Sequence, residues 1–183
     1  MLLAEDLLLL VTDDASGRLS AEGEHVDAGL GGANLIELTL LGKVDVSGEQ
    51  DQGRRGRIIV RDPSPPGDDV LGGVLRAGQG RALGIFPMRT WPAQDPSHKA
   101  EVRQLVTQAL VQTAAPDERT AALIALLHAL KREHKVVDPQ SYQLSRRQLR
   151  ARAAEIAQGN WASEAVRNAI DSMIGAAAAG AAG

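Results

Sequence analysis

Residues 25–42 read HVDAGLGGANLIELTLLG, and this stretch decides the class of the fold. Its apolar side chains recur on nearly every side of a helical wheel, and Gly42 supplies a helix stop signal. A helix that is apolar on most of its sides is covered by neighbouring elements on more than one of them. We therefore predict a central, buried helix over residues 25–41.

Capping signals and apolar periodicity predict further helices on both sides of this one. Asp95-Pro96 is typical of an N-cap followed by proline at the first helical position, and Pro116 opens the next helix. Ser145 with Gln148 three residues later forms a capping box. The predicted helices cover residues 2–12, 95–110, 116–130 and 145–157, and a last one carries Val166, Ile170, Met173 and Ile174 on one stripe.

Short apolar runs predict two β-hairpins. Residues 44–46 and 58–60 flank a polar loop, and the proline-rich stretch 62–67 then acts as a connector. A second hairpin is predicted over residues 74–86, with a glycine-bearing reversal in its middle. The fold class is thus mainly α, a helical core of about five to six helices with one or two small β-hairpins. We expect a single domain over residues 1–183, with a frayed Ala/Gly tail at residues 175–183.

Composition excludes several classes of function. The formal net charge is -3 and only four residues are aromatic, which argues against a nucleic-acid partner. Cysteine is missing, so disulfides and thiolate metal sites are excluded, and a reducing compartment is favoured. The acidic N-terminus does not resemble a signal peptide, and no run approaches the roughly 20 apolar residues of a spanning helix. We expect a cytoplasmic protein that lies on a membrane if it meets one.

Catalytic and metal-binding patterns are missing from the chain. The four histidines are spread out, and His128 sits in an apolar run typical of a hydrogen-bonded core histidine. Adjacent acid pairs such as Asp13-Asp14 point apart and suit turns and caps, and no serine stands in a nucleophile motif. The glycines at 29–32 lack the spacing of a phosphate loop and favour close helix packing or a kink. We predict no catalytic residue, no metal and no cofactor.

Basic clusters are the remaining candidates for function. Arg54, Arg55 and Arg57 lie in the loop of the first hairpin, where contact with an anionic surface and a simply solvated face are equally open readings. The cluster Lys131, Arg132 and Lys135 is explained more simply by favourable interaction with a helix C-terminus, and the helix after Ser145 carries four arginines.

Five segments, taken in order, resemble the Golgi phosphoprotein 3-like family. The stretch Gly29 to Val44 resembles its signature helix, and Leu2 to Leu10 resembles its opening. The other three are the connector Asp62 to Asp68, the hairpin segment Gly73 to Pro87, and the helix from Pro116-Asp117-Glu118-Arg119 to Ala129.

The resemblance implies a mainly helical, non-enzymatic peripheral membrane protein that binds phosphatidylinositol 4-phosphate. The bias of 16 Arg to 4 Lys, with abundant Ala and Gly, indicates a GC-rich bacterial genome, where the lipid-surface role carries over without a Golgi. The chain departs from the family at two headgroup-pocket positions, which are Glu22 and Gly31 here. It also lacks an Arg-bearing helical segment between Asp68 and Gly73, so the lipid headgroup stays open.

The expected contact surface combines the two hairpins. The lipid-binding candidates are Arg54, Arg55, Arg57, Arg76 and Arg81. The membrane-contact or self-association candidates, by resemblance, are Val74, Leu75, Leu83, Ile85 and Phe86. A dimer is expected, because the missing segment would expose core surface. Two alternatives remain open: an adaptor that binds client proteins without lipid, and a winged-helix nucleic-acid binder.

Overall fold

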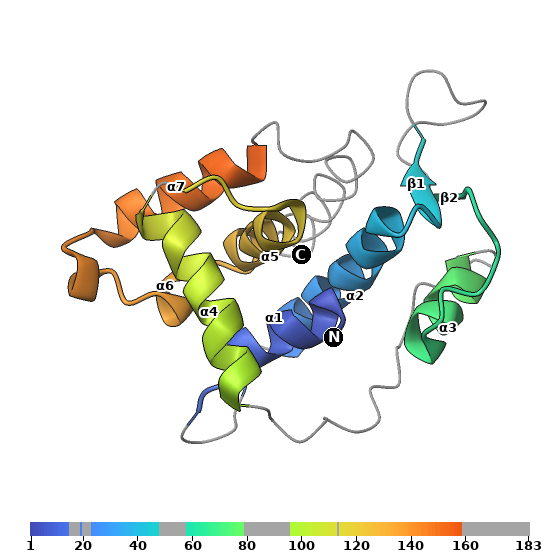
Figure 1. Cartoon of the computed structure of the whole chain (residues 1–183), viewed down its shortest axis with the longest axis horizontal. Helices are drawn as coiled ribbons and strands as arrows, with labels where there is room; N and C mark the ends of the chain where they lie inside the picture. Colours follow the sequence, from blue (N-terminus) through green and yellow to red (C-terminus); the bar gives the residue numbers. More distant parts are fainter. Residues whose placement is uncertain (15–18, 20–22, 48–57, 79–95, 113, 159–183) are drawn as a thin grey trace.

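The computed structural model of the chain describes residues 1–14, 19, 23–47, 58–78, 96–112 and 114–158. These residues hold seven α-helices, one antiparallel pair of strands and a short 3-10 helix (Figure 1). In chain order they are α1 (Leu3–Val11), α2 (Gly23–Leu40), β1 (Val44–Val46), β2 (Ile58–Val60), α3 (Asp69–Gly78), α4 (Pro96–Val111), α5 (Glu118–Ala129), α6 (Glu133–Val136), η1 (Gln140–Tyr142) and α7 (Arg146–Gln158). The predicted mainly α fold class is confirmed.

Helix α5 forms the centre of the main core. Every residue from Thr120 to Leu127 is buried, because α1, α2, α4, α6 and α7 all pack against this helix. The helix begins at Glu118, two residues after Pro116. Asp117 is its N-cap, because the Asp117 carboxylate accepts a hydrogen bond of 2.7 Å from the Thr120 backbone N–H. The prediction that this helix is largely buried is confirmed.

Helix α2 contributes to two separate apolar clusters, which explains why its sequence is apolar on so many sides. Val26, Leu30, Ala33 and Ile36 belong to the main core with α1 and α5. Leu38 instead joins a smaller cluster with Val44 of β1. A Cβ atom on Gly29 would lie 3.0 Å from a methyl group of Leu130, so glycine at this position permits close packing, as predicted.

The first predicted hairpin is confirmed at both strands. β1 and β2 pair antiparallel with Val44 opposite Val60 and Val46 opposite Ile58. The ribbon lies with α3 at one end of the long axis of the molecule, while α4, α6 and α7 gather at the other end (Figure 1).

The second predicted hairpin is wrong in its first arm, because Val74 and Leu75 lie in helix α3. Asp68 caps this helix by accepting hydrogen bonds from the backbone N–H groups of Val70 at 2.9 Å and Leu71 at 3.1 Å. Leu71, Val74 and Leu75 then share one helical face at spacings of three and four, and all three are buried in the cluster with Leu38. The second arm, residues 82–86, lies outside the described residues.

The remaining helix predictions hold where they can be compared. Helix α4 begins at Pro96, and α7 begins after Ser145, whose hydroxyl accepts from the Gln148 N–H at 3.2 Å. The Gln148 side chain accepts in return from the Ser145 N–H at 2.9 Å, which completes the predicted capping box. The short helix α6 was not predicted. The predicted last helix around Val166 lies outside the described residues.

Candidate functional site

Most of the predicted contact residues cannot be placed. Arg54, Arg55, Arg57, Arg81, Leu83, Ile85 and Phe86 lie outside the described residues, and so does the side chain of Arg76, whose backbone belongs to α3. Val74 and Leu75 are placed, and they are only 6% and 5% exposed. Their apolar side chains are therefore covered by the protein itself in this structure.

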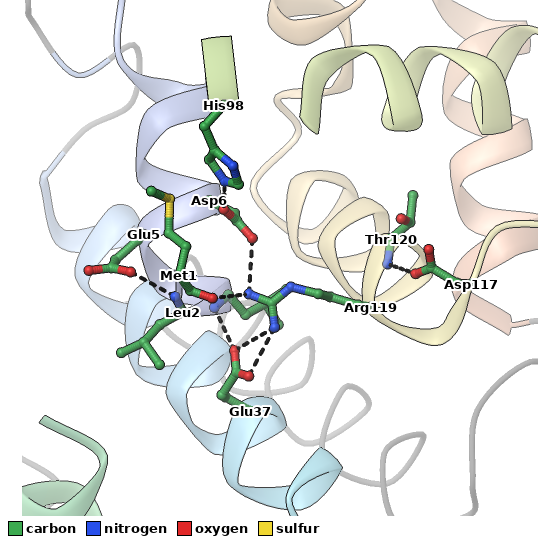
Figure 2. A network of polar contacts seen from close by, with 10 residues as sticks. Met1, Leu2, Glu5, Asp6, Glu37, His98, Asp117, Arg119 and Thr120 are labelled. Atoms are coloured by element: carbon green, nitrogen blue, oxygen red, sulfur yellow. Dashed lines mark hydrogen bonds and ion pairs between the residues drawn. The ribbon is translucent and has the colours of Figure 1, made fainter. Parts of the chain in front are cut away.

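A buried polar network joins the N-terminus to α2, α4 and α5 (Figure 2). The Arg119 guanidinium donates to both carboxylate oxygens of Glu37, at 2.9 and 3.0 Å, and to Asp6 at 3.0 Å. It also donates to the carbonyl oxygen of Met1 at 2.8 Å. Glu37 accepts in addition from the Leu3 backbone N–H at 2.6 Å, so that it satisfies one of the free donors at the start of α1.

Glu5 and Asp6 form another adjacent acid pair of the kind predicted to act in turns and caps, and only Glu5 fits that prediction. Glu5 does cap α1, because its carboxylate accepts from the Leu2 N–H at 2.7 Å. Asp6 is instead a buried ion-pair partner, 4% exposed, with His98 Nε2 at 2.7 Å on its second oxygen. Burial alone would lower the pKa of Arg119, but the hydrogen bond to Asp6 and the charge of Glu37 raise it.

The charged side chains of the network connect the N-terminus to three helices of the fold. Both oxygens of Asp6 and both oxygens of Glu37 have protein partners. Satisfied, buried ion pairs of this kind fix the relative positions of the elements that carry them. We therefore assign it a structural role.

Two further sets of charges are also paired. Lys99 is buried and donates to the Thr12 carbonyl at 2.7 Å and to the Asp14 carboxylate, which lowers the pKa of Asp14. Lys43 donates to Asp62 at 2.6 Å beside the β-ribbon. That hydrogen bond is the largest of the effects that lower the pKa of Asp62 to about 2.

Cationic side chains gather on α6 and α7, at the end of the molecule away from the β-ribbon (Figure 1). Helix α6 packs against α7, and the approach brings Arg146 close enough to His134 to affect its titration. Burial, followed by the charges of Arg146 and Lys135, lowers the pKa of His134. We name this region the α6–α7 basic surface and define it by Arg132, His134, Lys135, Arg146, Arg147 and Arg150.

The acids around the α6–α7 basic surface are engaged elsewhere. Glu133 is 3% exposed and lies 2.7 Å from His128 Nδ1, which places the predicted core histidine in a hydrogen bond. Asp138 accepts from Ser141 Oγ at 2.7 Å and from the Gln140 N–H at 3.2 Å, and these bonds lower its pKa. In the part of the chain that the structure describes, no ion pair joins an acid to Lys135, Arg146, Arg147 or Arg150.

The described part of the chain carries neither a metal-binding cluster nor a membrane-spanning helix. Among those residues, no group of three or more His, Asp or Glu side chains is arranged to hold a metal ion. None of the helices described there combines the length and the apolar character that crossing a bilayer requires.

Comparison with known proteins places the chain in a family. A model of the Golgi phosphoprotein 3 (GPP34) family matches residues 3–75 and again residues 70–173. The two matched segments meet at residues 70–75, where the sequence analysis placed a missing segment. A search among curated proteins found no match. Glu37 in the signature helix, Asp6 in the opening segment and Arg119 in the Pro116 segment are joined in one network, so three of the resembling segments meet in space. The chain belongs to the Golgi phosphoprotein 3 (GPP34) family, which is not a known enzyme family.

Proposed function

We propose that this protein is a non-enzymatic, peripheral membrane protein that binds anionic phospholipid from the cytoplasmic side. The observation that carries the proposal is the family match over both halves of the chain. By the resemblance, the lipid is a phosphoinositide such as phosphatidylinositol 4-phosphate.

The proposed contact lies at the end of the molecule formed by the β-ribbon and α3. Arg54, Arg55 and Arg57 fall in the sequence between β1 and β2, and Arg76 and Arg81 fall at and after the end of α3. Each basic residue held near an anionic bilayer contributes about 1 kcal/mol at physiological salt. A few arginines are therefore enough for reversible attachment.

The apolar part of the proposed contact is smaller than the sequence predicted, because two of its five residues are buried. Val74 and Leu75 are buried against Leu38 and Leu71, so they support α3 from inside. The proposal keeps Leu83, Ile85 and Phe86 as the apolar residues that contact the membrane or a second copy of the chain.

Vesicle co-sedimentation tests the proposal. Vesicles are neutral, or carry phosphatidylserine, or carry phosphatidylinositol 4-phosphate, each at about 0.05 and 0.2 M salt. Replacing Arg54, Arg55 and Arg57 together by Gln is expected to weaken binding to anionic vesicles roughly a hundredfold at low salt.

The matched control replaces Arg146, Arg147 and Arg150 by Gln, because it changes the net charge equally at the other end of the molecule. This control is expected to keep most of the vesicle binding. Sedimentation with no vesicle at either salt concentration would overturn the membrane proposal. Binding to phosphoinositide alone would add headgroup selectivity to it.

A further inference from the structure

The charge of this protein is distributed unevenly, and the segment that carries the α6–α7 basic surface is strongly basic. Residues 131–152 carry seven Lys or Arg and two acids, a net charge of +5, whereas the whole chain carries -3. Helix packing brings the parts of this segment together, since α6 contacts α7 directly. Lys135, Arg146, Arg147 and Arg150 are exposed.

Lys135 lies in the last turn of α6, where the helix dipole favours a cation, but the positions of the α7 arginines do not help the helix that carries them. Arg146 and Arg147 occupy the first turn of α7, which has no acidic residue, although the helix dipole favours anions there. Arg146 and Arg150 are four residues apart on one face, a like-charge spacing that costs a few tenths of a kcal/mol. Arg132 adds a buried Nε without a hydrogen-bond partner among the described residues. Stability of the fold therefore does not explain the α7 arginines of the cluster.

Insertion of α7 into a bilayer does not explain it either, and a purely electrostatic contact with anionic lipid is an outcome of the vesicle test below. A helix that lies on a membrane presents an apolar face to the lipid. The apolar residues of α7, Leu149, Ala153 and Ile156, are buried in the main core. Of the large exposed apolar side chains in the described residues, Leu105 of α4 and Tyr142 of η1 belong to this end, and neither lies on α6 or α7.

We propose that the α6–α7 basic surface binds an acidic protein segment, a stretch of a partner rich in Asp and Glu. Exposed arginines on successive turns of α7, with Lys135 on the neighbouring helix α6, fit several carboxylates spaced along a chain better than one compact phosphate. The planar guanidinium of arginine can pair with a carboxylate through two parallel hydrogen bonds. The surface lies opposite the β-ribbon along the long axis (Figure 1), so a partner bound here faces away from the membrane. Only this orientation rests on the proposed function.

Fluorescence anisotropy with a labelled peptide of Asp, Glu and Ser tests the proposal without any vesicle. The unchanged protein is expected to bind this peptide and not a peptide with Asn and Gln in place of the acids, and affinity is expected to fall as salt rises. The variant with Arg146, Arg147 and Arg150 replaced by Gln is expected to lose at least about tenfold in affinity.

The variant with Arg54, Arg55 and Arg57 replaced by Gln serves as the matched control and is expected to keep peptide binding. Failure of the protein to bind the peptide, or equal losses in both variants, would overturn the proposal. The same holds if the α7 variant loses vesicle binding instead, or if a DNA duplex competes as well as the peptide does. Failure of vesicle binding with intact peptide binding would reject the membrane role alone.

Discussion

Arg119 and Arg147 carry the same side chain in opposite surroundings. Arg119 donates to Glu37, Asp6 and the Met1 carbonyl, and both carboxylates are nearly excluded from solvent. Arg147 is exposed, stands at the start of a helix, and has no ion-pair partner among the described residues. The two residues therefore show that a paired arginine with buried partners stabilises the fold, whereas an exposed arginine without an ion-pair partner is available to another molecule. Variants of both kinds test this distinction.

The largest effect is expected from Arg119→Met. Removal of the guanidinium leaves Asp6 and Glu37 buried with one cationic partner fewer, which destabilises proteins by about 3–5 kcal/mol when the pair is fully buried. Because the Arg119 side chain is 38% exposed, we expect a loss of about 3 kcal/mol. Urea unfolding measures it, with Arg147→Met as the control. A loss below about 1 kcal/mol would show that the network is not needed for stability.

The next effect concerns the residue that starts α7. Ser145→Ala removes the hydroxyl that accepts from the Gln148 N–H, and loss of such a cap costs about 1 kcal/mol. The same variant keeps every cation of the α6–α7 basic surface, so peptide binding should persist at temperatures where the protein is folded. Urea unfolding and anisotropy together check both halves of this expectation. If stability were unchanged, the cap would not contribute as the geometry indicates.

A smaller effect of opposite sign is expected from Arg146→Glu with Arg147→Glu. Acids in the first turn interact favourably with the helix dipole, so stability should rise by about 0.5–1 kcal/mol. Peptide binding should be lost in the same variant. If the double variant unfolded more easily, these arginines would have a structural role, and the contrast with Arg119 would fail.

Local signals in the sequence predicted much of the helical scaffold and the paired strands. Capping boxes, proline at a first helical position and apolar periodicity act over a few residues, and α4, α7, β1 and β2 follow them. Helix α3 could also be predicted from the sequence, because Asp68 is a typical N-cap and Leu71, Val74 and Leu75 follow it at helical spacing. The turn-like glycines that follow Leu75 drew the interpretation toward a hairpin instead.

Contacts between distant segments were not predictable in the same way. Glu37 and Arg119 are 82 positions apart, and no local pattern indicates that they meet. Likewise, the clusters around Lys135 and Arg146 were seen separately, and the first was assigned to a helix terminus. Only the packing of α6 on α7 joins them into one surface. Their functional interpretation therefore required the fold.

The smallest effect is expected at the partly exposed pair between Lys43 and Asp62, whose burial lies between those of Arg119 with its partners and of Arg147. The Asp62 pKa is lowered from an ordinary 3.8 to about 2, first by the hydrogen bond from Lys43 and then by those from Ser64. Because the folded-state pKa is the lower one, its contribution to stability is present above about pH 3.8 and is lost as the pH falls toward 2.

Lys43→Met should raise the Asp62 pKa toward 3.8 without reaching it, since the Ser64 hydrogen bonds remain. NMR titration of the Asp62 carboxyl measures the shift, and Arg61→Met is the control, because Arg61 pairs with Asp45 at 3.0 Å instead. Stability near neutral pH should change little, since solvent screens the charge of Asp62. A larger loss would mean that exposed ion pairs also stabilise this fold. The presence of an ion-pair partner, and not burial, would then distinguish Arg119 from Arg147.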